Sequence, residues 1–489
     1  MIKLENVSFK YKDSMNLSGV EDINLEINKG EVVVICGESG CGKTTIIRIL
    51  NALIPQYYEG DLTGIVKVDN EVISNKDLSE LASKIGTVFQ NPKSQFFTLD
   101  TESEISFECE NLGYSKDNIL RRLEWVLKEF NIEKLRNKSL FDMSGGEKQK
   151  VACASVSAVF PQLILLDEPS SNLDIESIYQ LKSIISRWKE EGKTVVISEH
   201  RLHYLMDVAD KVIYMKRGKI QMNLSIDEFK KISCDKIKKL GLRALDIDEV
   251  KLQNNKVNDI KEKILIKKLY FKYRNSNKPS LDIENLELPN ESIIAIIGKN
   301  GAGKSTFSRC LCGLEKKAKG NVVFRGKSYN NKQMLKNSYM VFQDVNHQLF
   351  SESVYDELLI GNEDIGEREI NTMLDKMDLI HKKDMHPMSL SGGEKQRLVI
   401  GSAILSNKEI IIFDEPTSGL DYKHMLQVSK SLKELRKMGK AIFLISHDKE
   451  LIYETCDYML FIENGKVLWS RPMDSKGVEL IEGFFSETN

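Results

Sequence analysis

No run of apolar residues in this 489-residue sequence is long enough to cross a membrane as a helix. A membrane-spanning helix needs about 20 consecutive apolar residues, and the longest apolar runs here have the length of a strand. The first residues, MIKLEN, contain no apolar core of the kind found in signal peptides. We therefore expect a chain that stays in the cytosol and has no transmembrane segment of its own.

Charge of one sign and paired cysteines are also missing. Lys and Arg number 70 against 72 Asp and Glu, a net charge of −2, so the charge balance predicts no nucleic-acid partner. The eight cysteines are scattered and form no C-x-x-C pair, which argues against a structural zinc site and predicts reduced, mostly buried thiols. The length is that of two or more domains, and 41% apolar residues suffice for their cores.

One glycine-rich motif is present twice. GESGCGKT at residues 37–44 and GKNGAGKS at 298–305 both fit G-x-x-x-x-G-K-[ST]. Each follows an apolar run that predicts a buried strand, at 32–36 and 293–297, and each precedes a helical pattern. In that context the motif indicates a P-loop, in which backbone N–H groups and a helix N-terminus surround phosphate oxygens. The alternative, a plain glycine turn, does not explain the repeated lysine and hydroxyl.

The loops supply most of the predicted nucleotide ligands. Lys43 and Lys304 should reach the β- and γ-phosphates of ATP, and Thr44 and Ser305 should bind Mg²⁺. The complete predicted loop sets are Gly37, Glu38, Ser39, Gly40, Cys41, Gly42, Lys43, Thr44 and Thr45, and Gly298, Lys299, Asn300, Gly301, Ala302, Gly303, Lys304, Ser305 and Thr306.

A pair of acidic residues ends an apolar run in each half of the chain. Asp167 and Asp414 follow runs that predict buried strands, and Glu168 and Glu415 come next. An aspartate at this end of a strand beside a P-loop can hold Mg²⁺, and the second carboxylate can orient and activate water. Such a pair alone is usually a solvated turn, but its place after a strand, twice, favours catalysis.

Glutamine and histidine also occur at matching strand ends. Gln90 and Gln343 follow predicted strands and can contact Mg²⁺ or water. His200 and His447 follow later strands, where an imidazole can donate to the γ-phosphate and hold the catalytic glutamate. An isolated Gln or His is usually a surface or core residue; only the repeated register supports these roles.

The two halves align over most of their length, which indicates a duplicated domain. Strands alternate with helical segments, as in an α/β fold with a mainly parallel sheet. We expect domains at residues 1–233 and 264–489 and a tether at 234–263, partly helical near 235–240. The first half is longer at 54–58, which predicts a surface loop. Stretches 115–141 and 367–383 are expected to be helical.

Together these residues resemble the ATP-binding-cassette (ABC) ATPases, twice over. Ser-Gly-Gly-Glu, at Ser144, Gly145, Gly146 and Glu147 and again at Ser391, Gly392, Gly393 and Glu394, is similar to the signature sequence of that family. The runs that end at Asp174 and Asp421 resemble its D-loop, and Tyr11 and Tyr273 occupy the place of the aromatic that stacks on adenine. The resemblance implies tandem P-loop NTPase domains, each with a mainly parallel sheet, an antiparallel β part and a helical subdomain.

The resemblance also implies a mechanism. Two cassettes pair head to tail, so that Lys43 would share an ATP with Ser391, and Lys304 with Ser144. ATP closes the pair, and hydrolysis with Mg²⁺ lets it open. The tether would make the pairing intramolecular and the effective concentration of order mM.

A narrower resemblance follows each glutamine. FQNPKSQF at 89–96 and FQDVNHQL at 342–349, with the acidic stretches 100–107 and 354–357, are similar to the energy-coupling factor (ECF) group of vitamin and metal-ion importers, although the second half lacks the Asn-Pro. This resemblance implies a transmembrane coupling protein and a membrane-embedded substrate-binding protein as partners, no nucleic-acid partner, and a peripheral location on the cytoplasmic face of the membrane.

Two other functions remain open. Sugar importers also use fused cassettes, but often with one degenerate site, whereas both sites here are complete. Soluble tandem cassettes act on the ribosome, but they carry a long charged arm between the domains and basic surfaces. A DNA-repair cassette would need a long coiled coil, which the sequence lacks.

Overall fold

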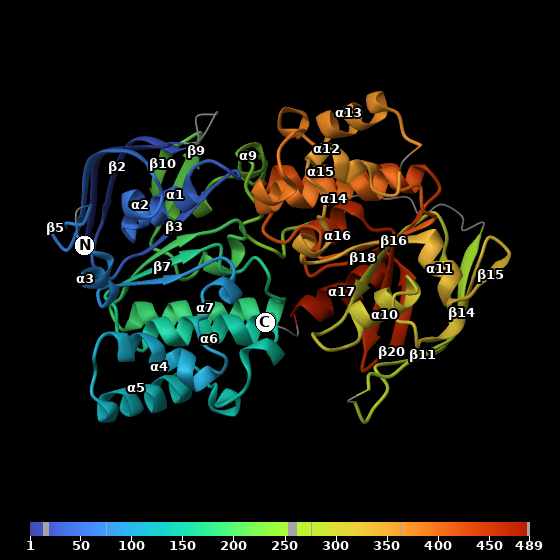
Figure 1. Cartoon of the computed structure of the whole chain (residues 1–489), viewed down its shortest axis with the longest axis horizontal. Coiled ribbons are helices and arrows are strands. Elements are labelled where there is room, and N and C mark those ends of the chain that lie inside the picture. The colour runs from blue at the N-terminus through green and yellow to red at the C-terminus, as the bar shows by residue number, and fades with distance from the viewer. Residues whose placement is uncertain (13–18, 75, 253–261, 275, 363, 487–489) are drawn as a thin grey trace. The chain divides into compact units, whose positions relative to one another are not determined.

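The computed structural model describes residues 1–12, 19–74, 76–252, 262–274, 276–362 and 364–486. Contacts between residues divide the chain into two compact units, one containing Met1–Asp246 and the other Ile247–Leu420 with His424–Asn489 (Figure 1). None of the helices in the described ranges combines the length and apolar composition needed to cross a bilayer.

The first unit contains two sheets. A four-stranded antiparallel sheet has the order β2-β1-β4-β5, and a six-stranded sheet has the order β10-β9-β3-β8-β7-β6, in which only β10 is antiparallel to its neighbour. The strands are β1 (Ile2–Tyr11), β2 (Gly19–Ile27), β3 (Val32–Gly37), β4 (Gly60–Val68), β5 (Glu71–Val72), β6 (Ile85–Val88), β7 (Leu163–Asp167), β8 (Thr194–Ser198), β9 (Lys211–Lys216) and β10 (Lys219–Ser225).

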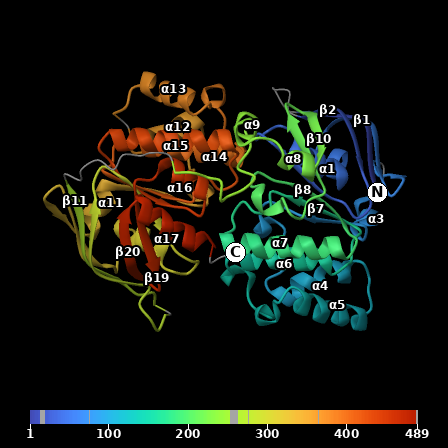
Figure 2. The same cartoon turned by 180° about the vertical axis from the view of Figure 1, so that it is seen from behind.

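Helices cover both faces of the six-stranded sheet. The helix α1 starts at the end of the P-loop, and α4 and α5 lie beyond α6 and α7 when seen from the sheet (Figures 1 and 2). The helices are α1 (Lys43–Leu50), α2 (Leu53–Gln56), α3 (Leu78–Ala82), α4 (Thr101–Asn111), α5 (Lys116–Glu129), α6 (Gly145–Ser157), α7 (Ile175–Glu190), α8 (Ile226–Lys230) and α9 (Cys234–Lys239), with 3₁₀ turns at Pro92–Ser94, Glu133–Leu135, Leu140–Asp142 and His203–Leu205.

The buried strand β3 separates two hydrophobic cores. Its residues Val33 and Ile35 face the core shared with the antiparallel sheet and α1, whereas Val32, Val34 and Cys36 face the core shared with α4 to α7. Because side chains alternate between the faces of a strand, a strand buried on both faces is apolar throughout. This explains why the apolar runs before the P-loop and the acidic pair were recognisable as strands.

The second unit repeats this architecture. Its sheets have the orders β12-β11-β14-β15 and β16-β17-β18-β13-β19-β20, the same topology read through equivalent strands. The strands are β11 (Lys263–Phe271), β12 (Leu281–Pro289), β13 (Ile293–Ile297), β14 (Lys319–Phe324), β15 (Lys327–Tyr329), β16 (Ser338–Val341), β17 (Ile410–Asp414), β18 (Ala441–Ile445), β19 (Tyr458–Glu463) and β20 (Lys466–Pro472).

The helices of the second unit also follow the first. Here α12 and α13 lie beyond α14 and α15 when seen from the sheet (Figure 1). The helices are α10 (Lys304–Leu311), α11 (Asn331–Asn337), α12 (Val354–Leu359), α13 (Glu367–Lys376), α14 (Gly392–Leu405), α15 (Tyr422–Lys437), α16 (Lys449–Thr455) and α17 (Ser475–Ser486), with 3₁₀ turns at Val345–Gln348, Ile380–Lys382 and Pro387–Ser389. The predicted fold class, with mixed parallel and antiparallel strands, is confirmed for both units.

The segment predicted to tether the domains begins as part of the first unit. The predicted helix is present as α9, Ile237 and Leu242 are buried in the core, and the hydroxyl of Tyr214 donates to the backbone oxygen of Leu240. Residues 253–261 of the predicted tether lie outside the described residues. The apolar residues of 234–246 are too few to show a helical periodicity. The sequence therefore did not predict that this segment packs in the core of the first unit.

Two other local predictions need correction. The stretch 54–58 is not simply a surface loop, because Ile54 is fully buried behind α1, although Gln56 and Tyr57 are exposed. The predicted helices 115–141 and 367–383 both end early. The helix α5 stops at Glu129 and α13 at Lys376, and Asn131 and Asp378, two residues further on in each case, have a positive φ that breaks the helix.

Candidate nucleotide-binding sites

Each P-loop connects a central strand to a helix through glycines in the left-handed region. In the first loop Gly40 and Gly42 have φ of 76° and 104°, and in the second Gly301 and Gly303 have 75° and 107°. These φ values are rarely open to residues that carry a Cβ. A Cβ on Gly37 would also lie 2.3 Å from the backbone oxygen of Met215. The loop is therefore a cradle built by glycine.

The side chain of the lysine that starts each P-loop helix bonds to the backbone of its own P-loop. The Nζ of Lys43 donates to the backbone oxygens of Gly37 and Glu38, at 3.2 and 3.4 Å. The Nζ of Lys304 makes the same contacts with Gly298 and Lys299, at 2.6 and 3.0 Å. Both lysines are buried, so each ammonium is a localised positive charge directly under the cradle.

The hydroxyl that follows each lysine contacts the strand-end aspartate. Thr44 donates to Oδ1 of Asp167 at 3.0 Å, and Ser198 donates to the same oxygen at 2.7 Å. Burial raises the pKa of Asp167, the negative charge of Glu168 adds to the rise, and the two hydroxyls oppose it. A hydroxyl beside a carboxylate is a donor set that suits Mg²⁺.

The second carboxylate of the pair is the centre of a polar network. Oε1 of Glu168 lies 3.1 Å from Nε2 of His200 and 3.9 Å from Nζ of Lys43, and Gln90 donates to Oε2 at 2.7 Å. Burial disfavours the charged form of Glu168, but the charge and hydrogen bond of His200, with the charge of Lys43, lower its pKa overall. The structure thus brings the P-loop lysine together with three residues that follow separate strands, Gln90, Glu168 and His200.

The second unit has the equivalent residues at the equivalent places. His447 Nε2 lies 3.8 Å from Oε1 of Glu415, and Ser305 donates to Asp414, whose pKa is raised by burial. Gln343 follows β16 and is exposed. Both Glu168 and Glu415 have positive φ, 45° and 50°. A non-glycine residue in this region is uncommon and is often found at functional sites.

The Ser-Gly-Gly-Glu residues form helix caps within their own units. Ser144 caps α6, with its N–H donating to Glu147 at 2.8 Å, and Ser391 makes the same bond with Glu394 at 2.9 Å. Lys138 and Lys382 pair with the two glutamates, at 2.9 and 2.7 Å. The carboxylates of Glu147 and Glu394 thereby complete capping boxes, and their role in binding nucleotide stays a prediction.

A signature glycine and the two D-loop aspartates lie at helix starts or at a close contact between helices. A Cβ on Gly146 would lie 2.1 Å from the Ser177 hydroxyl, so α6 approaches α7 closely there. Asp174 caps α7 by accepting from the N–H of Ser177 at 2.9 Å. Asp421 immediately precedes α15.

The predicted adenine-stacking tyrosines lie beside the P-loop helices. The hydroxyl of Tyr11 lies 3.3 Å from Thr45 Oγ1, and that of Tyr273 lies 3.4 Å from Thr306 Oγ1. In the first unit Arg48 donates to Tyr11 at 3.1 Å, and its guanidinium lies over the ring of Tyr58, 4.0 Å from the centroid.

Sequence reasoning missed two contributors to the first site. Ser198, which bonds Asp167, could have been found because it is the polar end of an apolar strand that precedes His200. Arg48 has no local signal, because its contact with Tyr11 joins the last turn of α1 to the end of β1.

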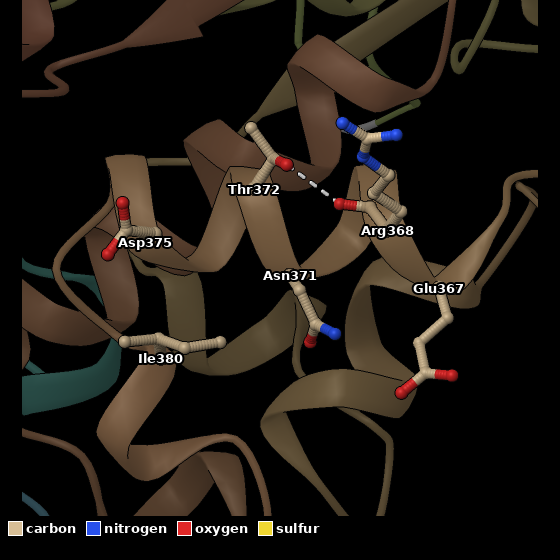
Figure 3. Close-up of a pocket in the computed structure, with 6 residues that line it drawn as sticks. All are labelled: Glu367, Arg368, Asn371, Thr372, Asp375 and Ile380. Carbon is tan, nitrogen blue, oxygen red and sulfur yellow. Dashed lines mark hydrogen bonds between the residues drawn. The ribbon is translucent and has the colours of Figure 1, made fainter.

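A shallow hollow elsewhere in the second unit is not the nucleotide site. It is lined by Glu367, Arg368, Asn371, Thr372, Asp375 and Ile380. Figure 3 shows that all but Ile380 come from the single helix α13, and that Thr372 bonds the backbone of Arg368. The hollow is open and lies outside the P-loop, so the geometry of the loops identifies the nucleotide sites better.

The model of the ABC transporter family matches residues 20–171 and again residues 281–418. The chain therefore belongs to the ABC transporter family. It is 42% identical over 474 residues to a Treponema denticola protein named "Putative ABC transporter ATP-binding protein", covering 96% of each chain. It is 31% identical over 528 residues to a Methanosarcina mazei protein of the same name, covering 96% of this chain and 89% of the relative.

Solved structures agree on the fold of this ABC protein. The one titled as a model of ribosome-bound archaeal Pelota and ABCE1 gives a TM-score of 0.71 at 22% identity, covering 98% of this chain and 80% of the other. The complex of archaeal ribosomal stalk protein aP1 with ribosome recycling factor aABCE1 gives 0.64 at 23% identity, covering 99% and 92%. At these identities the likeness shows the fold of a tandem ABC ATPase. As a member of the family, the protein binds and hydrolyses ATP with Mg²⁺.

Proposed function

We propose that this chain is the ATP-hydrolysing subunit of an ABC importer of the ECF type. It would work at the cytoplasmic face of the membrane with two kinds of partner on separate chains, a transmembrane coupling protein and a membrane-embedded substrate-binding protein. The names of its relatives from Treponema denticola and Methanosarcina mazei support a transporter. The sequences that follow Gln90 and Gln343 support the ECF type.

The proposed chemistry assigns a role to each residue of the first site. Lys43 and the loop amides would bind the phosphates, and Thr44 with Asp167 would hold Mg²⁺. Glu168, ionised by its neighbours, would orient and deprotonate the attacking water. Gln90 would position that water, and His200 would hold Glu168 and the γ-phosphate. The second site would use Lys304, Ser305, Asp414, Glu415, Gln343 and His447 in the same roles.

We also propose that each ATP is completed by the signature sequence of the other domain. This pairing follows from the family resemblance, and the caps support it in one respect. Ser144 and Ser391 begin α6 and α14, so their helices offer N-terminal backbone N–H groups suited to a phosphate.

The adenine-stacking role of the tyrosines gives a measurable expectation. Tyr11→Ala should raise the Kd of the first site for ATP by about tenfold, because stacking on an aromatic ring contributes about 1–3 kcal/mol per base. Tyr11→Phe keeps the ring and loses only the hydroxyl contacts, so it should change Kd much less. Titration with a fluorescent ATP analogue measures both, and equal effects of the two variants would contradict stacking.

The observation that carries the importer proposal is an exposed aromatic at the same place in both units. Phe97 follows Gln90 on the same loop and is 75% exposed, and Phe350 follows Gln343 and is 77% exposed. Phe97 stacks on Phe107 of α4, with ring centroids 5.1 Å apart, and Leu99 beside it is 69% exposed. Exposed apolar groups gathered in this way indicate a binding surface for another protein. Two copies suit a membrane partner that offers one apolar segment to each unit.

The test is to purify the tagged chain from membranes under mild detergent. We expect specific membrane proteins to co-purify, and Phe97→Ser with Phe350→Ser to reduce their recovery at least fivefold while basal ATPase stays within about twofold. The matched control is Phe160→Ser, which alters a partly exposed aromatic outside these loops. Recovery with ribosomes and without membrane proteins would reject the proposal in favour of the ribosomal alternative.

A further inference from the structure

Two buried glutamates hold the loops that present Phe97 and Phe350. In the first unit a single oxygen, Oε2 of Glu104, accepts from the N–H groups of Phe97 and Thr98 at 3.0 and 2.9 Å, and from the Thr98 hydroxyl at 2.9 Å. In the second unit Oε2 of Glu357 accepts from the N–H groups of Phe350 and Ser351, both at 2.9 Å. The same device therefore occurs twice.

These carboxylates are buried, and they accept hydrogen bonds from backbone N–H groups. Glu104 is 4% exposed and Glu357 is 5% exposed. A buried carboxylate must be compensated by donors, and charge-assisted bonds to backbone N–H groups are among the stronger hydrogen bonds in proteins. The backbone at Phe97 and Phe350 is thus fixed although the aromatic rings themselves are exposed.

The other end of each loop is tied by a glutamine. Oε1 of Gln95 accepts from the N–H of Phe89 at 3.1 Å, and Oε1 of Gln348 accepts from the N–H of Phe342 at 2.7 Å. Phe89 and Phe342 immediately precede the glutamines predicted to contact nucleotide. Each loop is therefore secured at both ends, beside the site and beside the displayed aromatic.

In the first unit this secured loop begins at the catalytic network. Gln90, the residue after Phe89, donates to Oε2 of Glu168 at 2.7 Å. We propose that Gln95 and Glu104, and in the second unit Gln348 and Glu357, are positioning residues that make residues 89–100 and 342–353 rigid connections. A change at the Gln90–Glu168 contact then moves the displayed Phe97 as one piece with the loop. The inference rests on the proposed function for its biological purpose, since the displayed ring would transmit the movement to an apolar segment of the membrane partner.

The test places 4-fluorophenylalanine at position 97 of the full chain and follows its ¹⁹F resonance. We expect the resonance to shift when a non-hydrolysable ATP analogue and Mg²⁺ are added. Glu104→Ala and Gln95→Ala should reduce that shift at least threefold, while the affinity for the analogue stays within about twofold of the parent. The matched control is Glu102→Ala, which lies on the same helix and pairs with Arg136 rather than with the loop.

Two results would overturn the proposal: an absent nucleotide response in the parent, or an undiminished response in both variants. If Glu104→Ala does not fold, Glu104→Gln and Thr98→Val replace it, and Thr98→Val should give a smaller reduction because it removes one of three bonds.

A second measurement separates this inference from the proposed function. The parent and the Glu104 variant are sedimented with native membrane vesicles and with protein-free lipid vesicles. We expect at least fivefold weaker binding of the variant to native vesicles. If neither protein binds native vesicles, the proposed function fails. A ¹⁹F response that is present in the parent and reduced in the Glu104 variant would still support the rigid connection.

Discussion

Replacing Glu168 and Glu415 together by glutamine is expected to lower the ATPase rate of the chain by about 100-fold or more, the range for loss of a general base. Glutamine keeps the size of the side chain but cannot accept the proton of the attacking water. Glu168 lies among His200, Lys43 and Gln90, an environment that keeps it ionised. Steady-state phosphate release measures the effect.

The single substitutions distinguish coupled from independent sites. Two independent sites would leave about half of the rate in each single variant, because effects at uncoupled positions add. Head-to-tail pairing predicts a much larger loss from either one. An unchanged rate in Glu168→Gln or Glu415→Gln would mean that the altered site is regulatory and would contradict the prediction of two working sites. Glu59→Gln, on the surface beside Lys12, serves as the control.

The second large effect is expected on ATP affinity. Lys43→Ala and Lys304→Ala should each raise the Kd of the altered site for ATP by about 10- to 100-fold, because a hydrogen bond to a charged group contributes about 1.5–3 kcal/mol. Each ammonium is buried under its loop and bonded to two backbone oxygens. Equilibrium titration with a fluorescent ATP analogue resolves the two sites.

A matched lysine outside the loops shows whether the effect is local. Lys316→Ala removes an exposed lysine that follows α10 and should leave both affinities unchanged. Because the alanine variants could loosen the loop itself, thermal unfolding without nucleotide is measured in parallel. An affinity unchanged in Lys43→Ala would remove this residue from the phosphate site.

Sequence alone determined the repeated core of this protein. The central strands β3, β7 and β8 are buried on both faces, so their middle residues are all apolar and stand out from the neighbouring segments. The P-loops were equally clear, since only glycine accepts the backbone that a phosphate cradle needs. Gln90, Glu168 and His200 were recognisable because parallel strands end at one edge of a sheet.

Only the tertiary structure decided how the residues between those strands are used. The motif that contains Glu147 gave no sign that its carboxylate accepts from the N–H of Ser144 and pairs with Lys138. Residues 234–246 were predicted to belong to a tether, but they are part of the first unit, where Ile237 and Leu242 lie in the hydrophobic core. Glu104 looked like one acidic residue among several on α4, and its bonds to the loop of Phe97 follow from how α4 is placed against that loop. A sequence pattern reflects how deeply a single helix or strand is buried and which backbone angles it needs. Which polar side chain bonds to which backbone group depends instead on how the helices, strands and loops pack together.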